Sequence, residues 1–126
     1  MATGAAIGLR SNGQTERRVL ALQADGSAMY TVQGLWTQVR EKLPVTTVIL
    51  SNRKYQILIG EFFSVGANPG PTAMNMLDLG NPDIGWVKLA SSFGMEAAPA
   101  DTLEACADLM RQSFRRPEPF LIELSI

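Results

Sequence analysis

Two apolar runs separated by one amphipathic stretch constrain the fold of this chain more than any other feature. Residues 19–24 and 45–50 are apolar or β-branched at nearly every position, which is typical of strands buried on both faces. The stretch between them has apolar residues at spacings of three or four: Met29, Val32, Trp36, Val39 and Leu43. This spacing predicts an amphipathic helix that ends near Pro44. Together the three segments predict a β-α-β unit.

A polar residue follows each of the two runs. Asp25, with Gly26 after it, follows the first run, and Asn52 follows the second. A helix of about 16 residues rises about 24 Å, close to the length of a strand of about six residues, so both strands should end at the same edge of the sheet. Ligands bind at this carboxyl edge in open parallel sheets. We therefore expect Asp25 and Asn52 to lie close together.

The rest of the chain alternates between helical and extended patterns. The expected elements are a small-residue helix over 2–9, a long loop with short helical pieces over 53–81, a helix capped by Asn81 and stopped by Gly94, a strand over 95–98, a helix opened by a capping box of Asp101 and Glu104, and a last strand over 120–126. The expected inward faces of the two later helices are Ile84, Val87, Ala90 and Phe93, and Leu103, Cys106, Ala107, Met110 and Phe114. This order predicts a single three-layer α/β/α domain over 1–126 with a mainly parallel sheet. It begins in a helix, as though its first elements were missing.

Composition excludes several classes of function. Eleven basic and twelve acidic residues leave a net charge of −1, so no overall field attracts nucleic acid or a membrane surface, and an anion would have to be held locally. The chain contains no histidine, which removes histidine triads and histidine zinc sites. Its single cysteine, Cys106, is expected to be a buried apolar residue in a cytoplasmic protein. No membrane span or signal peptide is expected.

Carboxylate and amide oxygens at one sheet edge are suitable ligands for a hard cation. Mg²⁺ takes oxygen ligands and shares its coordination with substrate phosphates. Gly26 would let the backbone approach closely, and Ser27 would begin a helix whose free amides and dipole can receive a phosphate. Asp-Gly and Asn are also common turn residues, so each alone would be structural. The pair at one edge favours a site for a metal and a diphosphate.

The segment that contains both residues resembles a known signature. "ADGSAMYTVQGLWTQVREKLPVTTVILSNRKYQIL" resembles the G-D-G-S-(x)n-N-N motif of thiamine diphosphate-dependent enzymes, most closely the acetolactate synthase and benzoylformate decarboxylase group. The similarity extends over the whole chain, from "ATGAAIGL" to "FLIELSI". The resemblance implies the pyrophosphate-binding domain of that family, a parallel α/β sheet flanked by helices.

The resemblance also implies roles for individual residues. The side chains of Asp25 and Asn52 and the carbonyl of Lys54 would bind Mg²⁺. The remaining cofactor contacts would come from Gly26, Ser27 and Tyr55, with the tyrosine lying against thiamine diphosphate. The chain departs from the motif at Ala24 and Ser51, which replace a glycine and an asparagine, and neither change removes a metal oxygen. Leu58 stands where pyruvate decarboxylase-like members have an acidic group, which favours the synthase and benzoylformate branch.

Two functions from different classes follow from this resemblance. The first is the cofactor-anchoring portion of a 2-keto acid decarboxylase or acetolactate synthase, inactive alone because the pyrimidine-binding domain and its activating glutamate are not in this sequence. That domain would have to come from a complementing chain, so the sequence leaves open whether this chain is itself an enzyme. The second is a non-catalytic binding module that forms a homo-oligomer through the flank left uncovered. A weaker third possibility is a flavodoxin-like nucleotide binder. The substrate is not indicated.

Overall fold

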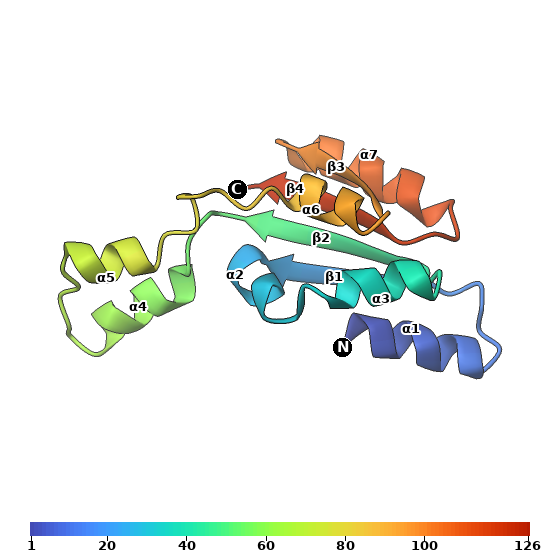
Figure 1. Cartoon of the computed structure of the whole chain (residues 1–126), viewed down its shortest axis with the longest axis horizontal. Helices are drawn as coiled ribbons and strands as arrows, with labels where there is room; N and C mark the ends of the chain where they lie inside the picture. The colour runs from blue at the N-terminus through green and yellow to red at the C-terminus, as the bar shows by residue number, and fades with distance from the viewer.

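A computed structural model describes residues 1–126, which form a four-stranded parallel sheet with helices on both faces (Figure 1). The strand order is β1-β2-β4-β3. The strands are β1 (Val19–Ala24), β2 (Val45–Ser51), β3 (Glu96–Ala100) and β4 (Phe120–Ser125). The helices are α1 (Ala2–Ser11), α2 (Asp25–Ala28), the 3₁₀ turn η1 (Met29–Thr31), α3 (Gly34–Arg40), α4 (Gln56–Ser64), α5 (Pro71–Met76), α6 (Trp86–Ser92) and α7 (Leu103–Phe114). The predicted α/β class and parallel sheet are confirmed.

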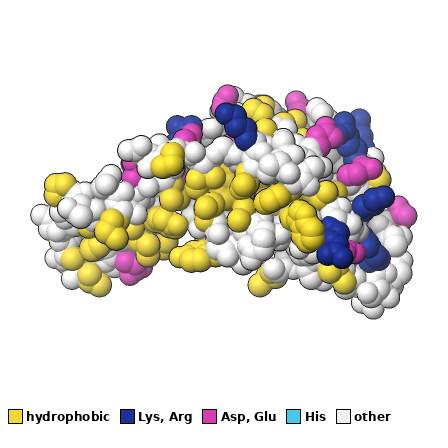
Figure 2. All heavy atoms as spheres, viewed as in Figure 1, with side chains coloured by type: hydrophobic (Ala, Val, Ile, Leu, Met, Phe, Trp, Pro, Cys, Tyr) yellow, Lys and Arg dark blue, Asp and Glu magenta, His cyan; other side chains and the backbone are white.

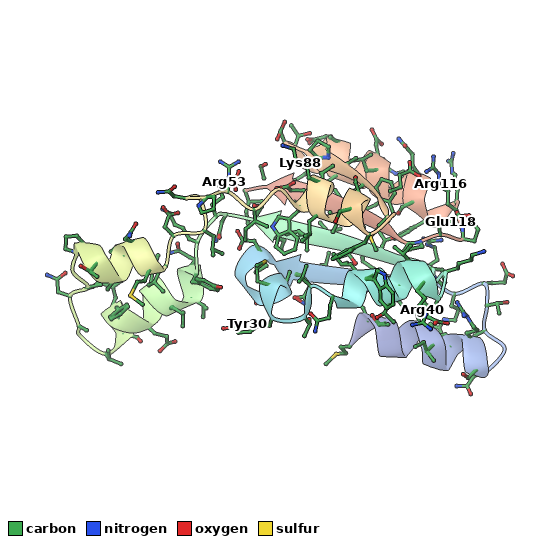
Figure 3. The ribbon with its side chains drawn as sticks, viewed as in Figure 1. Tyr30, Arg40, Arg53, Lys88, Arg116 and Glu118 are labelled. Atoms are coloured by element: carbon green, nitrogen blue, oxygen red, sulfur yellow. The ribbon has the colours of Figure 1, made fainter.

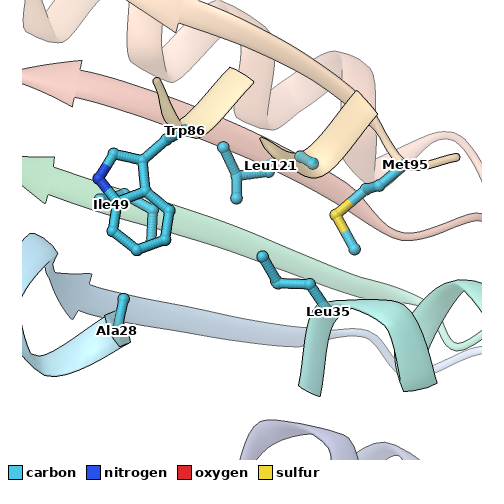
Figure 4. Packing of buried hydrophobic residues seen from close by; sticks show 7 residues of the cluster. Ala28, Leu35, Ile49, Trp86, Met95 and Leu121 are labelled. Carbon is cyan, nitrogen blue, oxygen red and sulfur yellow. The ribbon is translucent and has the colours of Figure 1, made fainter. Parts of the chain in front are cut away.

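Alternate residues of the central strands supply the two halves of the core, because successive strand side chains point to opposite faces. On one face Ile49 and Leu121 pack with Trp86 and with α2, α3 and α6 (Figure 4). On the other face Val48 and Ile122 pack against α7, together with the following residues: Ala100, Cys106, Phe120 and Leu124. Burial raises the pKa of the Cys106 thiol, as expected for an apolar, unreactive cysteine.

Strand β1 is at the edge of the sheet and is not buried on both faces. Its bounds match the predicted run, but Leu22 is 63% exposed and Leu20 is 42% exposed. Val19 and Ala21 point to the face covered by α1, whereas Leu20 and Leu22 point to the opposite face, where α7 covers only the other strands. The prediction of a strand buried on both faces was therefore wrong for β1. It is confirmed for β2, where six of the seven residues are buried.

The connection from β1 to β2 is broken into three short pieces instead of one long helix. The pieces are α2, η1 and α3. The predicted stripe is confirmed in part, since Val32 and Val39 pack against the core and Leu43 is fully buried. Trp36, expected in the core, is 48% exposed and lies beneath the guanidinium of Arg40. Leu35 and Gln38 are the buried residues of α3 instead.

The later helices also start at other residues than predicted. Helix α6 begins at Trp86, after a turn that contains the cis Asn81–Pro82 peptide, so Asn81 is not its cap. It ends as expected before Gly94, whose φ of +81° favours glycine. The cap of α7 is Thr102, whose Oγ1 accepts a hydrogen bond from Ala105 N at 3.1 Å, and not the predicted Asp101. Two residues of the expected α7 inward face, Leu103 and Phe114, are exposed.

Helices α4 and α5 form an arm that projects away from the sheet (Figure 1). The prediction of short helical pieces in this loop is confirmed. The arm exposes large apolar side chains: Ile57, Leu58, Phe63, Val65, Met74 and Met76. No helix in the chain combines the length and apolar composition that a bilayer crossing needs.

Candidate functional site at the carboxyl edge of the sheet

Asp25 lies at the carboxyl end of β1, beside the loop that follows β2. The parallel register pairs Ala24 with Leu50, so the two strands end side by side. The Asp25 side chain is 1% exposed. Its Oδ1 accepts a hydrogen bond from Gly26 N at 2.8 Å, and its Oδ2 accepts one from Arg53 N at 2.7 Å. Asp25 therefore joins the two loops, as the β-α-β arithmetic predicted.

Asn52 is half-buried in the loop that Asp25 contacts. Its Oδ1 accepts a hydrogen bond from Lys54 N at 3.0 Å, which closes a tight turn around Arg53, a residue held at a φ of +57°. The Lys54 carbonyl accepts no hydrogen bond. A side-chain carboxylate, a side-chain amide and a free carbonyl are thus supplied by two adjoining loops. This is the oxygen donor set that suits Mg²⁺.

Gly26 and Tyr55 are in direct contact. A Cβ atom on Gly26 would lie 2.6 Å from Cδ1 and Cε1 of the Tyr55 ring, so only glycine leaves room for this ring. Ser27 is exposed beside them. The Gly26 amide already donates to Asp25, and α2 has only four residues. The Gly26 amide is therefore already engaged, and a helix of one turn has a weaker dipole than the long helix that was expected to receive a phosphate.

Substituting Gly26 with alanine tests the contact with Tyr55. Because the new methyl group would overlap the ring, we expect Gly26→Ala to displace Tyr55 and to destabilise the fold by about 1–3 kcal/mol. The measurement is urea unfolding followed by circular dichroism. In a Tyr55→Ala background the same substitution should cost much less. An equal cost in both backgrounds would show that Tyr55 is not the residue that excludes a side chain at position 26.

Further ionisable residues surround the two loops, and the sequence analysis did not identify them. Asp78 Oδ1 accepts a hydrogen bond from Gly80 N at 2.8 Å, and its backbone bridges that of Lys54. Arg53 Nε lies 3.3 Å from Asp83 Oδ1. Burial raises the pKa of Glu123 on β4, although its hydrogen bond from Val87 N opposes this shift. Only its place near the end of the last strand could have indicated Glu123 from sequence.

The oxygen atoms of the two loops suit one metal ion that is bound by one carboxylate and by neutral oxygens. No three His, Cys, Asp or Glu side chains in the chain come together as a metal site. An ion here would therefore have Asp25 as its only carboxylate from the proposed set and would need neutral oxygens or ligand phosphates to complete its coordination. That requirement is characteristic of Mg²⁺ bound together with a phosphorylated ligand.

Comparisons with known proteins identify the family of the chain. Residues 1–124 match the family described as "Thiamine pyrophosphate enzyme, C-terminal TPP binding domain". The chain is 45% identical to "Putative acetolactate synthase large subunit IlvX" of Mycobacterium tuberculosis over 99% of its own length and 24% of that protein. It is 31% identical to benzoylformate decarboxylase of Pseudomonas aeruginosa, over 95% of this chain and 21% of that protein.

A solved structure shows the same likeness in three dimensions. The benzoylformate decarboxylase of Polynucleobacter necessarius superposes with a TM-score of 0.83 at 29% identity, covering 99% of this chain and 22% of that one. The chain thus spans about a quarter or less of the relatives that it matches. From the family match over nearly its full length, the chain belongs to the thiamine pyrophosphate enzymes and corresponds to their C-terminal cofactor-binding domain, of the acetolactate synthase-like and decarboxylase-like type.

Proposed function

We propose that this chain anchors the diphosphate of thiamine diphosphate through Mg²⁺, as one portion of an enzyme that acts on a 2-keto acid. The ion would be held by Asp25, Asn52 and the Lys54 carbonyl, with Gly26, Ser27 and Tyr55 beside the cofactor. The observation that carries the proposal is the buried Asp25 carboxylate, which bonds to the loop of Asn52 through Arg53 N. The family match supports thiamine diphosphate as the ligand.

Thiamine diphosphate supplies the electron sink for carbanion chemistry when it is bound. The residues of this chain contribute binding and orientation, since none of them is proposed to activate the thiamine ring. An acetolactate synthase-like or benzoylformate decarboxylase-like activity is the type suggested by the relatives' names. We propose that the activity requires a pyrimidine-binding domain from a complementing chain, and that these 126 residues alone are catalytically silent.

Calorimetry of the 126-residue chain tests the anchoring role. We expect thiamine diphosphate to bind in the presence of Mg²⁺ and to bind at least about 10-fold more weakly in EDTA, because the metal neutralises the diphosphate beside Asp25. Pyruvate and benzoylformate should not be decarboxylated by the chain alone. Binding that EDTA leaves unchanged would remove the metal from the proposal, and turnover by the isolated chain would contradict its silence.

A second candidate function, an oligomeric binding module, is supported by the uncovered side of β1. This strand has one unpaired edge, and Leu20 and Leu22 expose apolar surface next to it. Exposed strand edges and apolar patches of this kind promote association. The exposed apolar residues of the α4–α5 arm add a second such surface.

Association through β1 can be measured by analytical ultracentrifugation. We expect the wild-type chain to form dimers or larger species, and Leu22→Lys to shift it to monomer, because a charge at this edge opposes strand pairing. Leu103→Lys is the matched control, since Leu103 is similarly exposed but lies on α7. A monomeric wild-type chain, or the same shift from Leu103→Lys, would contradict association through β1.

A further inference from the structure

A cavity of about 460 Å³ lies at the edge of the sheet opposite Asp25 and Asn52. Its walls come from α1, from the end of α7 and from the segments that precede three of the strands. Arg18 and Pro44 come directly before β1 and β2, and Pro117 lies three residues before β4. Arg116 and Glu118 are therefore found at the far end of the molecule from Arg53 (Figure 3). A strand of six residues spans about 20 Å, so a ligand in this cavity would not touch the carboxyl-edge loops.

The lining of this cavity is strongly cationic, although the whole chain has a net charge of −1. Six of the eleven basic residues line it: Arg10, Arg17, Arg18, Lys42, Arg115 and Arg116. Glu16 is the single acidic residue in the lining. Lys and Arg side chains gather at this end of the molecule in Figure 2. Such a concentration of one charge inside a hollow focuses a positive potential there.

Most of these cations lack a carboxylate partner. Arg116 forms an ion pair with Glu96, and Arg10 donates to the carbonyl of Lys42 at 3.1 Å. Arg17 donates only to the neutral side chain of Gln14, at 3.1 Å. The side chains of Lys42 and Arg115 form no ion pair. The positive charge of the cavity is thus largely uncompensated within the chain.

Arg18, which also lines the cavity, has incomplete hydrogen bonding. Its Nη2 donates to the Glu118 carbonyl at 3.0 Å, but its Nε is buried and has no hydrogen-bond partner. Burial also lowers the pKa of Arg18, against the opposing influence of the nearby Glu118 carboxylate. A buried donor without an acceptor is costly. An anion in the cavity would relieve the repulsion among these guanidinium groups.

We propose that this cavity binds a small molecule that carries a polyphosphate group. Its volume lies within the range of small-ligand pockets, about 300–1,000 Å³. Guanidinium forks match phosphate oxygens in a bidentate manner, and several of them suit a ligand with several negative charges. Only three of the 14 lining residues are hydrophobic, so the phosphates provide most of the recognition. The site is separate from the proposed cofactor site and does not depend on it.

Calorimetric titration of the 126-residue chain in EDTA tests this site, with inorganic tripolyphosphate, ATP and AMP as probes. We expect tripolyphosphate and ATP to bind and AMP to bind at least about 10-fold more weakly, because it has fewer charges. Tighter binding of ATP than of tripolyphosphate would identify a nucleotide as the ligand, and equal binding would identify the polyphosphate alone. The double variant Arg17→Gln/Arg115→Gln should lose at least about 10-fold in affinity for both. Arg18 is left unchanged because it holds the Glu118 carbonyl.

Two control variants distinguish binding in this cavity from non-specific electrostatic binding and from binding at the carboxyl edge of the sheet. Lys88→Gln/Arg111→Gln removes the same charge from side chains that do not line the cavity and should leave tripolyphosphate binding within about 2-fold of wild type, because Arg111 is already paired with Asp108 and exposed charges are screened by salt. Asp25→Asn should also leave it intact. The proposal is overturned if millimolar tripolyphosphate gives no binding, if the Lys88/Arg111 control loses as much as the Arg17/Arg115 variant, or if Asp25→Asn abolishes binding.

Discussion

Replacing Trp86 with alanine should destabilise this chain by about 3–5 kcal/mol, a large part of the stability of an ordinary domain. Trp86 is completely buried. It belongs to one buried cluster with Ile49 and Leu121 of the central strands and Ala28 of α2 (Figure 4). Alanine would leave a cavity where α2, α6 and the sheet meet. Urea unfolding followed by far-UV circular dichroism measures the loss.

Trp36→Ala is the matched control, because Trp36 is the second tryptophan of the chain but is half exposed under Arg40. We expect it to cost no more than about 1 kcal/mol. Trp86→Phe should cost clearly less than Trp86→Ala, since Trp86 Nε1 is buried without an acceptor and phenylalanine removes that donor. Equal costs for Trp36→Ala and Trp86→Ala would show that Trp86 does not hold this half of the core.

The two tryptophans illustrate what the sequence could and could not predict. The hydrophobic stripe placed Trp36 in the core and omitted Trp86, whereas the structure has the opposite arrangement. In the connection between β1 and β2, Val32, Val39 and Leu43 face inward as predicted, but Ala28 and Leu35 are buried in place of their neighbours Met29 and Trp36. Because apolar residues stand at both positions of each pair, a period of 3.6 residues does not decide which neighbour faces the core. The strands were predicted closely, because a continuous apolar run indicates a strand whichever face each of its side chains occupies.

Burial of the edge strand could not be predicted from its own residues. The run Val19–Ala24 is apolar on both faces, and the sequence does not say which face another element covers. The strand order and the extent of α7 decide that Leu20 and Leu22 are exposed. Tertiary arrangement therefore determined burial where the local pattern was symmetric.

The candidate site was predictable in its outline and not in its detail. The spacing of Asp25 and Asn52 along a β-α-β unit placed them at one edge, and the structure brings their loops together. Their role as metal ligands stays a prediction. The contact of Tyr55 with Gly26 and the hydrogen bond from Arg53 N to Asp25 depend on backbone conformations, such as the positive φ of Arg53. No residue pattern specifies those conformations.

Asp25→Asn should weaken binding of thiamine diphosphate in Mg²⁺ by about 10–100-fold, as expected when a charged ligand becomes neutral. The decisive expectation is that EDTA no longer changes the affinity of the variant, because the metal has lost its carboxylate. Calorimetry with and without EDTA measures both quantities. The substitution also disturbs the bonds from Gly26 N and Arg53 N, at a cost of about 1–3 kcal/mol, so the fold must be checked by circular dichroism at the same temperature.

Asp78→Asn separates the metal from a general loss of negative charge. Asp78 lies on the neighbouring loop, where its backbone bridges that of Lys54, and it is not among the proposed ligands. The variant should keep the difference in affinity between Mg²⁺ and EDTA that the wild-type chain shows. If Asp78→Asn weakened binding as much as Asp25→Asn, the effect would belong to the charge of the whole edge. If Asp25→Asn kept its response to EDTA, Asp25 would not be a ligand, and the ion would have to be held elsewhere.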